Sequence, residues 1–372
     1  MKKRTREQLQ RELLAGLKRH RRYLARKETP SVPGRSLRNS HNHSIFHGYR
    51  SIDAPELLSI YNISKEDGSL YTQAIDFYDQ IRRYVGQEKC VISFKNTQVI
   101  SAAAIVVIYA AIEESLQKGT ARATIEWSGS NSAVVVNKQL RNINIHLLIQ
   151  RKQITYSFRN SQSMPIVRGT SNQYVDDIID YVQQFIYENE MSPEEEYIFA
   201  DAVTEAINNV GLHAYPDTDA QDRNWWLMCD VKDGQLFLAI YDTGVGIPAT
   251  VLEKKWFWAS LKAFYPEEYN ELIKLIPGFE SSGLKFVVPQ KLKDAQMIYL
   301  SMQGDVTGTR RSKHGQGSKS IRALVDDTED GKLWIFSHKG LYTYPAEDNE
   351  TGLYKLPKQL PGTLVQWNIK LS

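Results

Sequence analysis

Residues 192–215, SPEEEYIFADAVTEAINNVGLHAY, carry the strongest local signal in the chain. Ser192 is a favourable N-cap, Pro193 suits the first turn, and Glu195 stands where it would complete a capping box. A helix is therefore predicted from here to about Ala214. One side of this helix is apolar and would face a core: Phe199, Val203, Ala206 and Val210. Another side carries a polar line with one residue per turn: Asp201, Glu205, Asn209 and His213.

A second segment places a carboxylate and two glycines at the end of a predicted strand. The apolar run 236–240 is typical of a buried strand, and Asp242 follows it, with Gly244 and Gly246 at alternate positions. Glycine allows the backbone to approach a neighbouring group closely. Asp-Thr-Gly turns are also common in ordinary loops, so this segment is informative mainly through its order with the others.

Two more segments follow towards the C-terminus. Gly315 and Gly317 come directly before a helical apolar pattern, and the free N–H groups at such a helix start favour anions. The apolar pattern is formed by Ile321, Leu324 and Val325, and basic residues flank it: Arg310, Arg311, Lys313 and Lys319. Gly362 and Thr363 then open a predicted terminal strand over 364–371.

In this order, the four segments resemble the N, G1, G2 and last boxes of the GHKL superfamily of ATP-binding domains. The first box is closest to the versions in histidine kinases and anti-sigma kinases. The resemblance implies a Bergerat α/β sandwich with a mixed sheet over residues 165–372, binding ATP and Mg²⁺. It implies that Asn209 ligates Mg²⁺, that Glu205 holds or activates a water as the catalytic residue, and that Asp242 accepts the exocyclic amine of adenine. The other residues that it assigns to the nucleotide are His213, Gly244, Gly246, Gly315, Gly317 and Thr363.

The sequence departs from this family in two places. The connection between the second and third boxes is too long for an ordinary loop, and predicts a structured lid insertion at about 249–313 with a mobile tip. Within it, 256–261 and 272–276 have apolar patterns that suit helices. The third box has His314 where many relatives have glycine, which weakens the expectation of turnover more than that of nucleotide binding.

Residues 50–152 predict a separate α/β unit. Strands are expected at 91–94 and 123–127, and helices at 102–116 and 133–140. A helix between two strands implies a parallel crossover. The order resembles the STAS fold of anti-sigma-factor antagonists, in which a turn carries a phosphorylated hydroxyl. Ala102 and Ala103 occupy the hydroxyl positions here, so the phosphorylation chemistry is expected to be lost, and Ser101 is expected to be an N-cap.

Residues 1–49 are expected to form a basic N-terminal helix and a linker. The first 28 residues combine basic side chains with a stripe of leucines at helical spacing. Three interpretations fit this pattern. The helix contacts nucleic acid through its phosphates, or it binds an anionic membrane surface. In the third interpretation its leucine stripe docks on a protein surface, which is the body of this chain, another protein or a second copy in an oligomer. His41, His43 and His47 lack an acidic or cysteine partner at ligand spacing and are interpreted as a polar loop.

Composition narrows the function classes. No apolar run predicts a membrane span, no signal-peptide pattern is present, and Cys90 and Cys229 are interpreted as buried thiols of a cytoplasmic protein. Two functions fit the segments together. The first is a regulatory switch in which ATP orders the lid and changes engagement of a partner protein or nucleic acid. The second is an ATPase or a serine/threonine protein kinase of the anti-sigma type, as one component of a bacterial stress or antiviral system.

Overall fold

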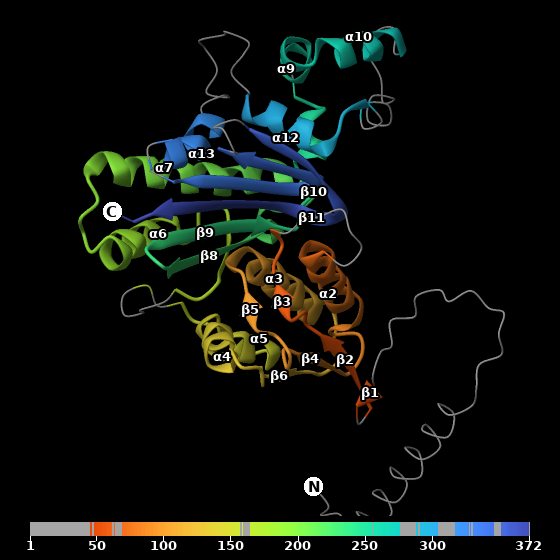
Figure 1. Ribbon diagram of the computed structural model, residues 1–372, viewed down its shortest axis with the longest axis vertical. Helices are drawn as coiled ribbons and strands as arrows, with labels where there is room; N and C mark the ends of the chain where they lie inside the picture. Colours follow the sequence, from red (N-terminus) through yellow and green to blue (C-terminus); the bar gives the residue numbers. More distant parts are fainter. Residues whose placement is uncertain are drawn as a thin grey trace, which may run out of the picture. The chain divides into compact units, whose positions relative to one another are not determined.

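The computed structural model describes residues 45–46, 48–61, 63, 69–156, 158, 164–254, 256–275, 288, 291–303, 317–326, 328, 330–345 and 351–371 (Figure 1). The predicted basic helix within 1–28 lies outside these residues, as do His41, His43, His47, His314 and Gly315. By its internal contacts the chain divides into residues 1–43 and one compact unit, 44–372, and only the second is described here. This unit is mixed α/β, with one largely parallel sheet, one antiparallel sheet and one two-stranded parallel pair.

The first sheet has the strand order β1-β2-β4-β6. Its strands are β1 (Ile45–Phe46), β2 (Tyr49–Asp53), β4 (Cys90–Ser93) and β6 (Ala123–Glu126). β2, β4 and β6 run parallel, while β1 is antiparallel to β2. β3 (Leu57–Leu58) and β5 (Val99–Ile100) form a separate parallel pair. The parallel crossover predicted between the strands at 91–94 and 123–127 is therefore confirmed.

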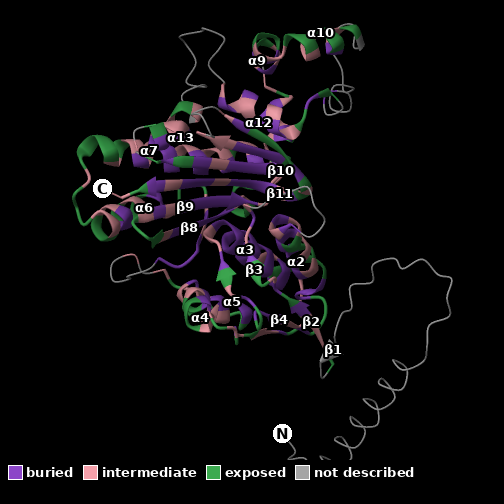
Figure 2. Ribbon diagram, in the orientation of Figure 1, coloured by how far each residue is buried: buried purple, intermediate pink, exposed green. Residues whose placement is uncertain are grey.

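Helix α3 (Ala102–Lys118) makes this crossover, and it is buried along most of its length (Figure 2). Ser101 is its N-cap and accepts a hydrogen bond from Ala104 N at 3.4 Å, as predicted. The other helices of this half are α2 (Leu70–Tyr84), α4 (Ala133–Asn142) and α5 (Ile145–Ile149). A helix that is apolar on nearly all sides must be covered on nearly all sides, which locates α3 inside the molecule.

The second sheet has five strands in the order β10-β11-β9-β8-β7. They are β7 (Val167–Thr170), β8 (Asn224–Lys232), β9 (Gln235–Asp242), β10 (Lys332–Tyr344) and β11 (Gly352–Lys370). The expectation of a mixed sheet is wrong for these strands, because all four pairings are antiparallel. Hairpins join β8 to β9 and β10 to β11, and a hairpin can only connect antiparallel neighbours.

β11 begins twelve residues before the predicted start of the terminal strand at 364. Pro357 and Pro361 argue against a strand in this stretch, because proline cannot donate to a ladder. The pairing with β10 tolerates them because it shifts register around His338, passing from Leu360 to Lys355 on β11. The prolines therefore stand at the irregular part of the ladder.

Alternate residues of the second sheet face two different cores. Leu238 and Ile240 of β9 pack with helices on one side, whereas Ala239 and Tyr241 pack with α2 and α3 on the other. The helices that pack against Leu238 and Ile240 are α6 (Val175–Tyr181), α7 (Pro193–Asn209) and α13 (Gly317–Asp326). Each of the first two continues directly into a π-helical turn, Val182–Ile186 after α6 and Val210–Ala214 after α7. A short 3₁₀ turn, Ala220–Asp222, precedes β8. The α2–α3 layer therefore lies between the two sheets.

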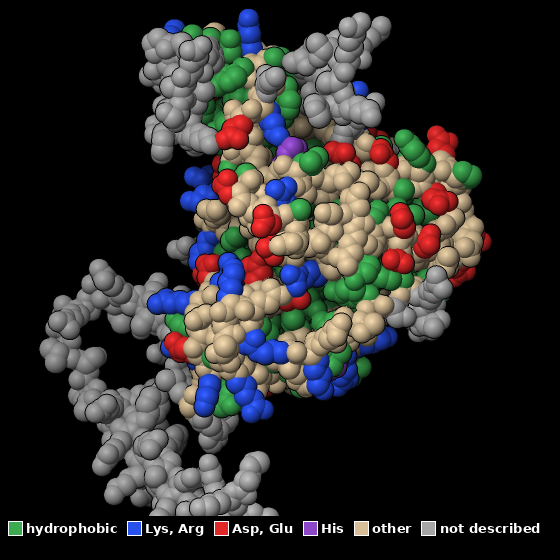
Figure 3. Space-filling view, turned by 180° about the vertical axis from the view of Figure 1, so that it is seen from behind, with side chains coloured by type: hydrophobic (Ala, Val, Ile, Leu, Met, Phe, Trp, Pro, Cys, Tyr) green, Lys and Arg blue, Asp and Glu red, His purple; other side chains and the backbone are tan. Residues whose placement is uncertain are grey.

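The predicted start of α7 is confirmed. Ser192 N donates to Glu195 Oε2 at 2.7 Å, and Glu195 N donates to Ser192 Oγ at 3.2 Å, which completes the capping box. Acidic side chains gather over α6 and the start of α7, whereas Lys and Arg are more frequent over the first half of the unit (Figure 3).

The lid insertion is helical where it is described. It contains α8 (Ile247–Val251), α9 (Phe257–Phe264), α10 (Pro266–Leu275) and α12 (Asp294–Met302), which confirms the predicted helices at 256–261 and near 272. These helices share a small core of their own: Val251, Phe257, Leu261, Leu272, Val288, Leu292, Met297 and Leu300. The expected mobile tip lies outside the described residues. No helix in the described part of the chain has both the length and the apolarity that a membrane crossing requires.

Candidate functional site

Asp242 is the last residue of β9, between Trp225 on β8 and Thr363 on β11. It is only 4% exposed. Its Oδ1 accepts a hydrogen bond from Gly244 N at 2.8 Å, and the backbone of Thr363 contributes another. Burial raises the pKa of Asp242 to about 7 despite these two donors. Within the described residues, Asp242 forms no ion pair, so its charge lacks a compensating cation.

The loop after Asp242 is pressed against the end of the α7 helix. Val245 N donates to Ala214 O at 2.8 Å. A Cβ at Gly244 would lie 2.2 Å from that same carbonyl oxygen, so no larger residue fits. The resemblance assigned Gly244 to the nucleotide, and in the structure the absence of a side chain there is required by this contact with Ala214. The π-helical turn that ends at Ala214 sets the position of the loop.

Strand β10 supports the other side of the loop. Ile247 N donates to Ser337 Oγ at 3.0 Å, and His338 Nε2 donates to Val245 O at 2.7 Å. Gly246 has φ +80°, and a Cβ there would lie 2.8 Å from Ser337 Oγ. The Ser337 hydroxyl also lies 3.2 Å from Thr363 Oγ1. The predicted Thr363 is therefore beside Asp242, and Ser337 joins both to the loop.

The polar line on α7 retains its predicted spacing. Asn209 Nδ2 donates to Glu205 Oε1 at 3.2 Å, which leaves the Asn209 side-chain oxygen as the atom suited to a cation. Burial raises the pKa of Glu205, while the hydrogen bond from Asn209 acts in the opposite direction. A carboxyl group with a raised pKa is better matched to proton transfer near neutral pH.

His213 meets the start of the lid. Lys254 Nζ lies 3.0 Å from His213 Nδ1, and burial lowers the pKa of Lys254. Gly317 is the first residue of α13, which packs against α7. The site thus brings together Asp242, Gly244, Gly246 and Thr363, and separately Glu205, Asn209 and His213 on the helix that the loop contacts. Gly315 lies outside the described residues.

Sequence reasoning missed three residues of this site: Ser337, His338 and Lys254. The first two were missed because no strand was predicted for 332–344, although Leu333, Ile335 and Ser337 alternate as in a half-buried strand. No sequence signal indicates Lys254, since its contact to His213 joins positions 41 residues apart.

No cluster of three or more His, Cys, Asp or Glu side chains that could hold a metal occurs among the described residues.

A cleft of 380 Å³ lies elsewhere, lined in part by Glu113, Lys152, Tyr156 and Arg168, and Asp242 does not line it. We take Asp242 and its loop as the candidate site because a buried carboxylate without a cation has clearer chemistry than this open, polar cleft. No protein-family model and no curated protein sequence matches the chain.

Proposed function

We propose that this chain is an ATP- and Mg²⁺-binding regulatory protein, in which nucleotide binding orders the lid and switches engagement of a partner protein or nucleic acid. The observation that carries the proposal is Asp242. It is a buried carboxyl with two backbone donors, no ion pair among the described residues, and a position at the last residue of a strand. Such a group gains most from a ligand that supplies another hydrogen-bond donor.

Adenine supplies that donor through its exocyclic amine. Guanine has a carbonyl oxygen at the equivalent place, and two acceptors would then face each other without a proton between them. A buried polar group left unpaired costs about 1–3 kcal/mol, which corresponds to about a ten- to hundredfold difference in affinity. Asp242 therefore favours ATP over GTP.

The α7 side chains fit the metal and the phosphates of the same ligand. Asn209 offers one neutral oxygen, and Glu205, one turn earlier, accepts hydrogen bonds from it or from a metal-bound water. When bound, Mg²⁺ would neutralise phosphate charge. Gly317 begins α13, whose N-terminal N–H groups favour an anion.

The lid is physically connected to this site, which supports a regulatory role. Its first helix begins at Ile247, whose N–H is held by Ser337, and Lys254 contacts His213. Its last described helix, α12, is attached to β10 because Lys339 N donates to Asp294 Oδ2 at 2.8 Å. A ligand that changes the loop or His213 would therefore act directly on the start of the lid, and on α12 through β10.

The alternative function is ATP hydrolysis or protein phosphorylation. It is favoured by Glu205, whose pKa is raised by burial and which stands one turn from Asn209. Phosphate release under saturating MgATP separates the two functions. Binding without release supports the switch. Release that is lost in Glu205→Gln, with ATP affinity kept, supports the enzyme.

Calorimetry tests the proposal directly. The parent protein should bind MgATP more tightly than MgGTP, and Asp242→Asn should bind MgATP about ten- to hundredfold more weakly. Asp230→Asn is the matched control, because burial also raises the pKa of this β8 carboxyl but it lies in the strand interior. Equal ATP affinity in the parent and in folded Asp242→Asn would refute the adenine assignment.

Limited proteolysis tests the switch. MgATP should slow cleavage within residues 249–313, where the lid was predicted. Tight binding of MgATP with no change in the rate or pattern of cleavage would contradict nucleotide-dependent ordering of the lid, while leaving nucleotide binding itself intact.

A further inference from the structure

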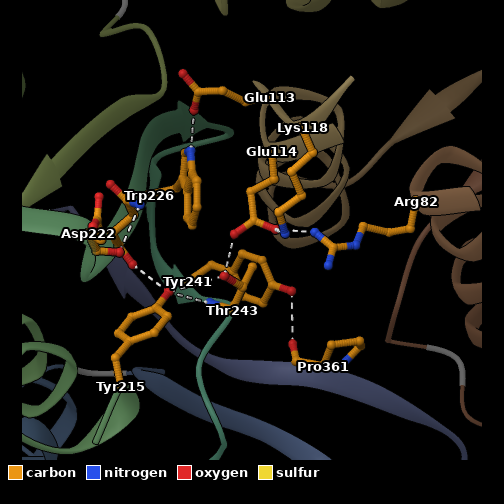
Figure 4. Close-up of polar contacts among 11 residues, drawn as sticks. Arg82, Glu113, Glu114, Lys118, Tyr215, Asp222, Trp226, Tyr241, Thr243 and Pro361 are labelled. Atoms are coloured by element: carbon orange, nitrogen blue, oxygen red, sulfur yellow. Dashed lines mark hydrogen bonds and ion pairs between the residues drawn. The ribbon is translucent and has the colours of Figure 1, made fainter. Parts of the chain in front are cut away.

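Thr243, between Asp242 and Gly244, joins the candidate loop to helix α3 on the opposite face of the sheet. Its hydroxyl donates to Glu114 Oε1 at 2.5 Å (Figure 4). This contact links residues 129 positions apart, one in the loop and one in the helix between the two sheets. Along the sequence, Glu114 is remote from every segment to which the resemblance assigned a nucleotide ligand, and the fold alone brings it to this loop.

The hydrogen bonds around Thr243 leave it little freedom. Its N–H donates to Tyr215 Oη at 3.0 Å, and Tyr215 Oη donates its own proton to Asn224 O at 2.8 Å. The two hydroxyl oxygens lie 3.1 Å apart, but each has a single proton, and both protons are already donated elsewhere. The Thr243 proton is therefore directed to Glu114.

Glu114 is itself held from its other side. Arg82 of α2 forms an ion pair with it, and Lys118 Nζ lies 3.9 Å away, one turn along α3. The Glu114 side chain is only 12% exposed, so this pairing compensates much of the cost of burying its charge. An acceptor that is fixed by a charged partner holds its donor in a defined place.

A second contact on the same face supports the other part of the site. Tyr241 Oη donates to Pro361 O at 2.8 Å, directly before Gly362 and Thr363 (Figure 4). Gly362 has φ +77°, and a Cβ there would lie 1.8 Å from Asp242 O. The α3 face of the sheet therefore holds both chain segments that flank the Asp242 carboxyl.

We propose that Glu114 is a positioning residue for the candidate nucleotide site, and that through it the α2–α3 layer sets the conformation of loop 242–246 and the affinity for ATP. The effect on affinity rests on the proposed function, whereas the effect on the loop does not. Glu114 acts through Thr243 and does not itself contact a nucleotide.

Thr243→Val tests this proposal, because valine keeps the shape of threonine but lacks the hydroxyl. We expect about tenfold weaker ATP binding and at least about tenfold faster amide exchange at residues 243 and 244 in nucleotide-free protein. Thr243→Ser, which retains the hydroxyl, should restore most of both properties. Glu114→Ala should reproduce the valine result, and the double variant should be no worse than either single variant.

Glu113→Gln is the matched control. Glu113 is next to Glu114 and nearly as buried, but its Oε2 accepts from Trp226 Nε1 at 2.6 Å instead of from the loop. ATP affinity and loop exchange should stay within about twofold of the parent. The proposal is overturned if amide exchange at residues 243 and 244 in Thr243→Val is as slow as in the parent. It is also overturned if Glu113→Gln changes ATP affinity and exchange as much as Thr243→Val does, or if the losses of the two single variants add in the double variant. If the parent binds no ATP, the proposed function fails, and the exchange data still decide the role of Glu114.

Discussion

Helices α7 and α3 cover opposite faces of the same sheet, and their carboxylates differ in what they contact. Among the described residues, Glu205 on α7 accepts a hydrogen bond from the amide of Asn209 and forms no ion pair, and burial raises its pKa. Glu114 on α3 has Arg82, Lys118 and Thr243. Asp242, at the end of the sheet between them, accepts from the backbone N–H groups of Gly244 and Thr363 and forms no ion pair within the described residues. Glu114 on the α3 side is therefore compensated by cations of the protein, whereas Asp242 and Glu205 are not.

The largest expected effect is a pH-dependent gain in stability in Asp242→Asn. Burial raises the pKa of this carboxyl to about 7, from an ordinary value of 3.8, so the native state binds the proton more tightly than the unfolded state. The parent therefore loses stability as pH rises from 3.8 to about 7, and asparagine does not. Relative to the parent, the variant should gain about 2–3 kcal/mol in the free energy of unfolding between pH 5 and pH 8.

Urea unfolding of the nucleotide-free protein at both pH values measures this gain. Asp233→Asn, in the exposed turn between β8 and β9, controls for the loss of one charge. If Asp242→Asn changes the free energy of unfolding by the same amount at pH 5 and at pH 8, the Asp242 carboxyl does not have a raised pKa, and its charge is not left uncompensated in the native state.

The next effect contrasts the two helices by removing one carboxylate from each. Glu114→Ala leaves Arg82 without its partner, and should lower the free energy of unfolding by about 2 kcal/mol, less than for a deeply buried pair because Arg82 is a third exposed. Glu205→Ala leaves no cation unpaired and should change it by less than about 0.5 kcal/mol. The same denaturant titration measures both variants. Equal losses in the free energy of unfolding would show that the carboxylates of α3 and α7 are equally important for stability, which would contradict the contrast between the two helices.

The elements of this comparison differ in how far sequence could reveal them. Local signals were sufficient for α7, since its capping box and apolar spacing depend on residues within one turn of each other. They were also sufficient for the position of Asp242 at the end of β9. Residues 50–152 were interpreted as a separate unit, and the packing of α3 on this sheet could not be predicted, because an apolar helix does not indicate which distant strands cover it. Nothing local to Glu114 indicates Thr243, 129 residues away.

The antiparallel order of the second sheet shows the same limit. On β8 and β9 the buried residues follow one another almost without interruption, because α3 covers one face of these strands and α7 the other. Continuous apolar runs identify a buried strand but not its neighbours or their direction. The mixed sheet was expected from the family resemblance. The hairpin of β10 and β11 was not expected, because Pro357 and Pro361 argue against a strand in the first half of β11.

A third, smaller effect is a pH dependence of ATP affinity. In the proposed site the ionised carboxylate of Asp242 would accept the adenine amine, whereas its protonated form would present a competing donor. Because the pKa of Asp242 is about 7, affinity should fall by up to about tenfold for each pH unit below 7 and be level above it. Calorimetry from pH 5.5 to 8.5 measures this slope. The slope of Asp242→Asn is subtracted, since titration of the ATP phosphates is common to both proteins. A parent slope no steeper than that of the variant would contradict a titrating Asp242.

The smallest expected effect concerns the cation at α7. Asn209→Ala removes the one neutral oxygen that this helix offers, so the increase in ATP affinity on adding Mg²⁺ should shrink by about fivefold, while binding of ATP without the metal should change little. Asn208→Ala, the adjacent residue on a different side of the helix, is the control and should keep the full Mg²⁺ effect. The effect is modest because most ligands of such a cation are waters and phosphate oxygens that the substitution leaves in place. A Mg²⁺ effect that survives in Asn209→Ala would place the cation elsewhere, and the role assigned to Asn209 on this face of the sheet would be lost.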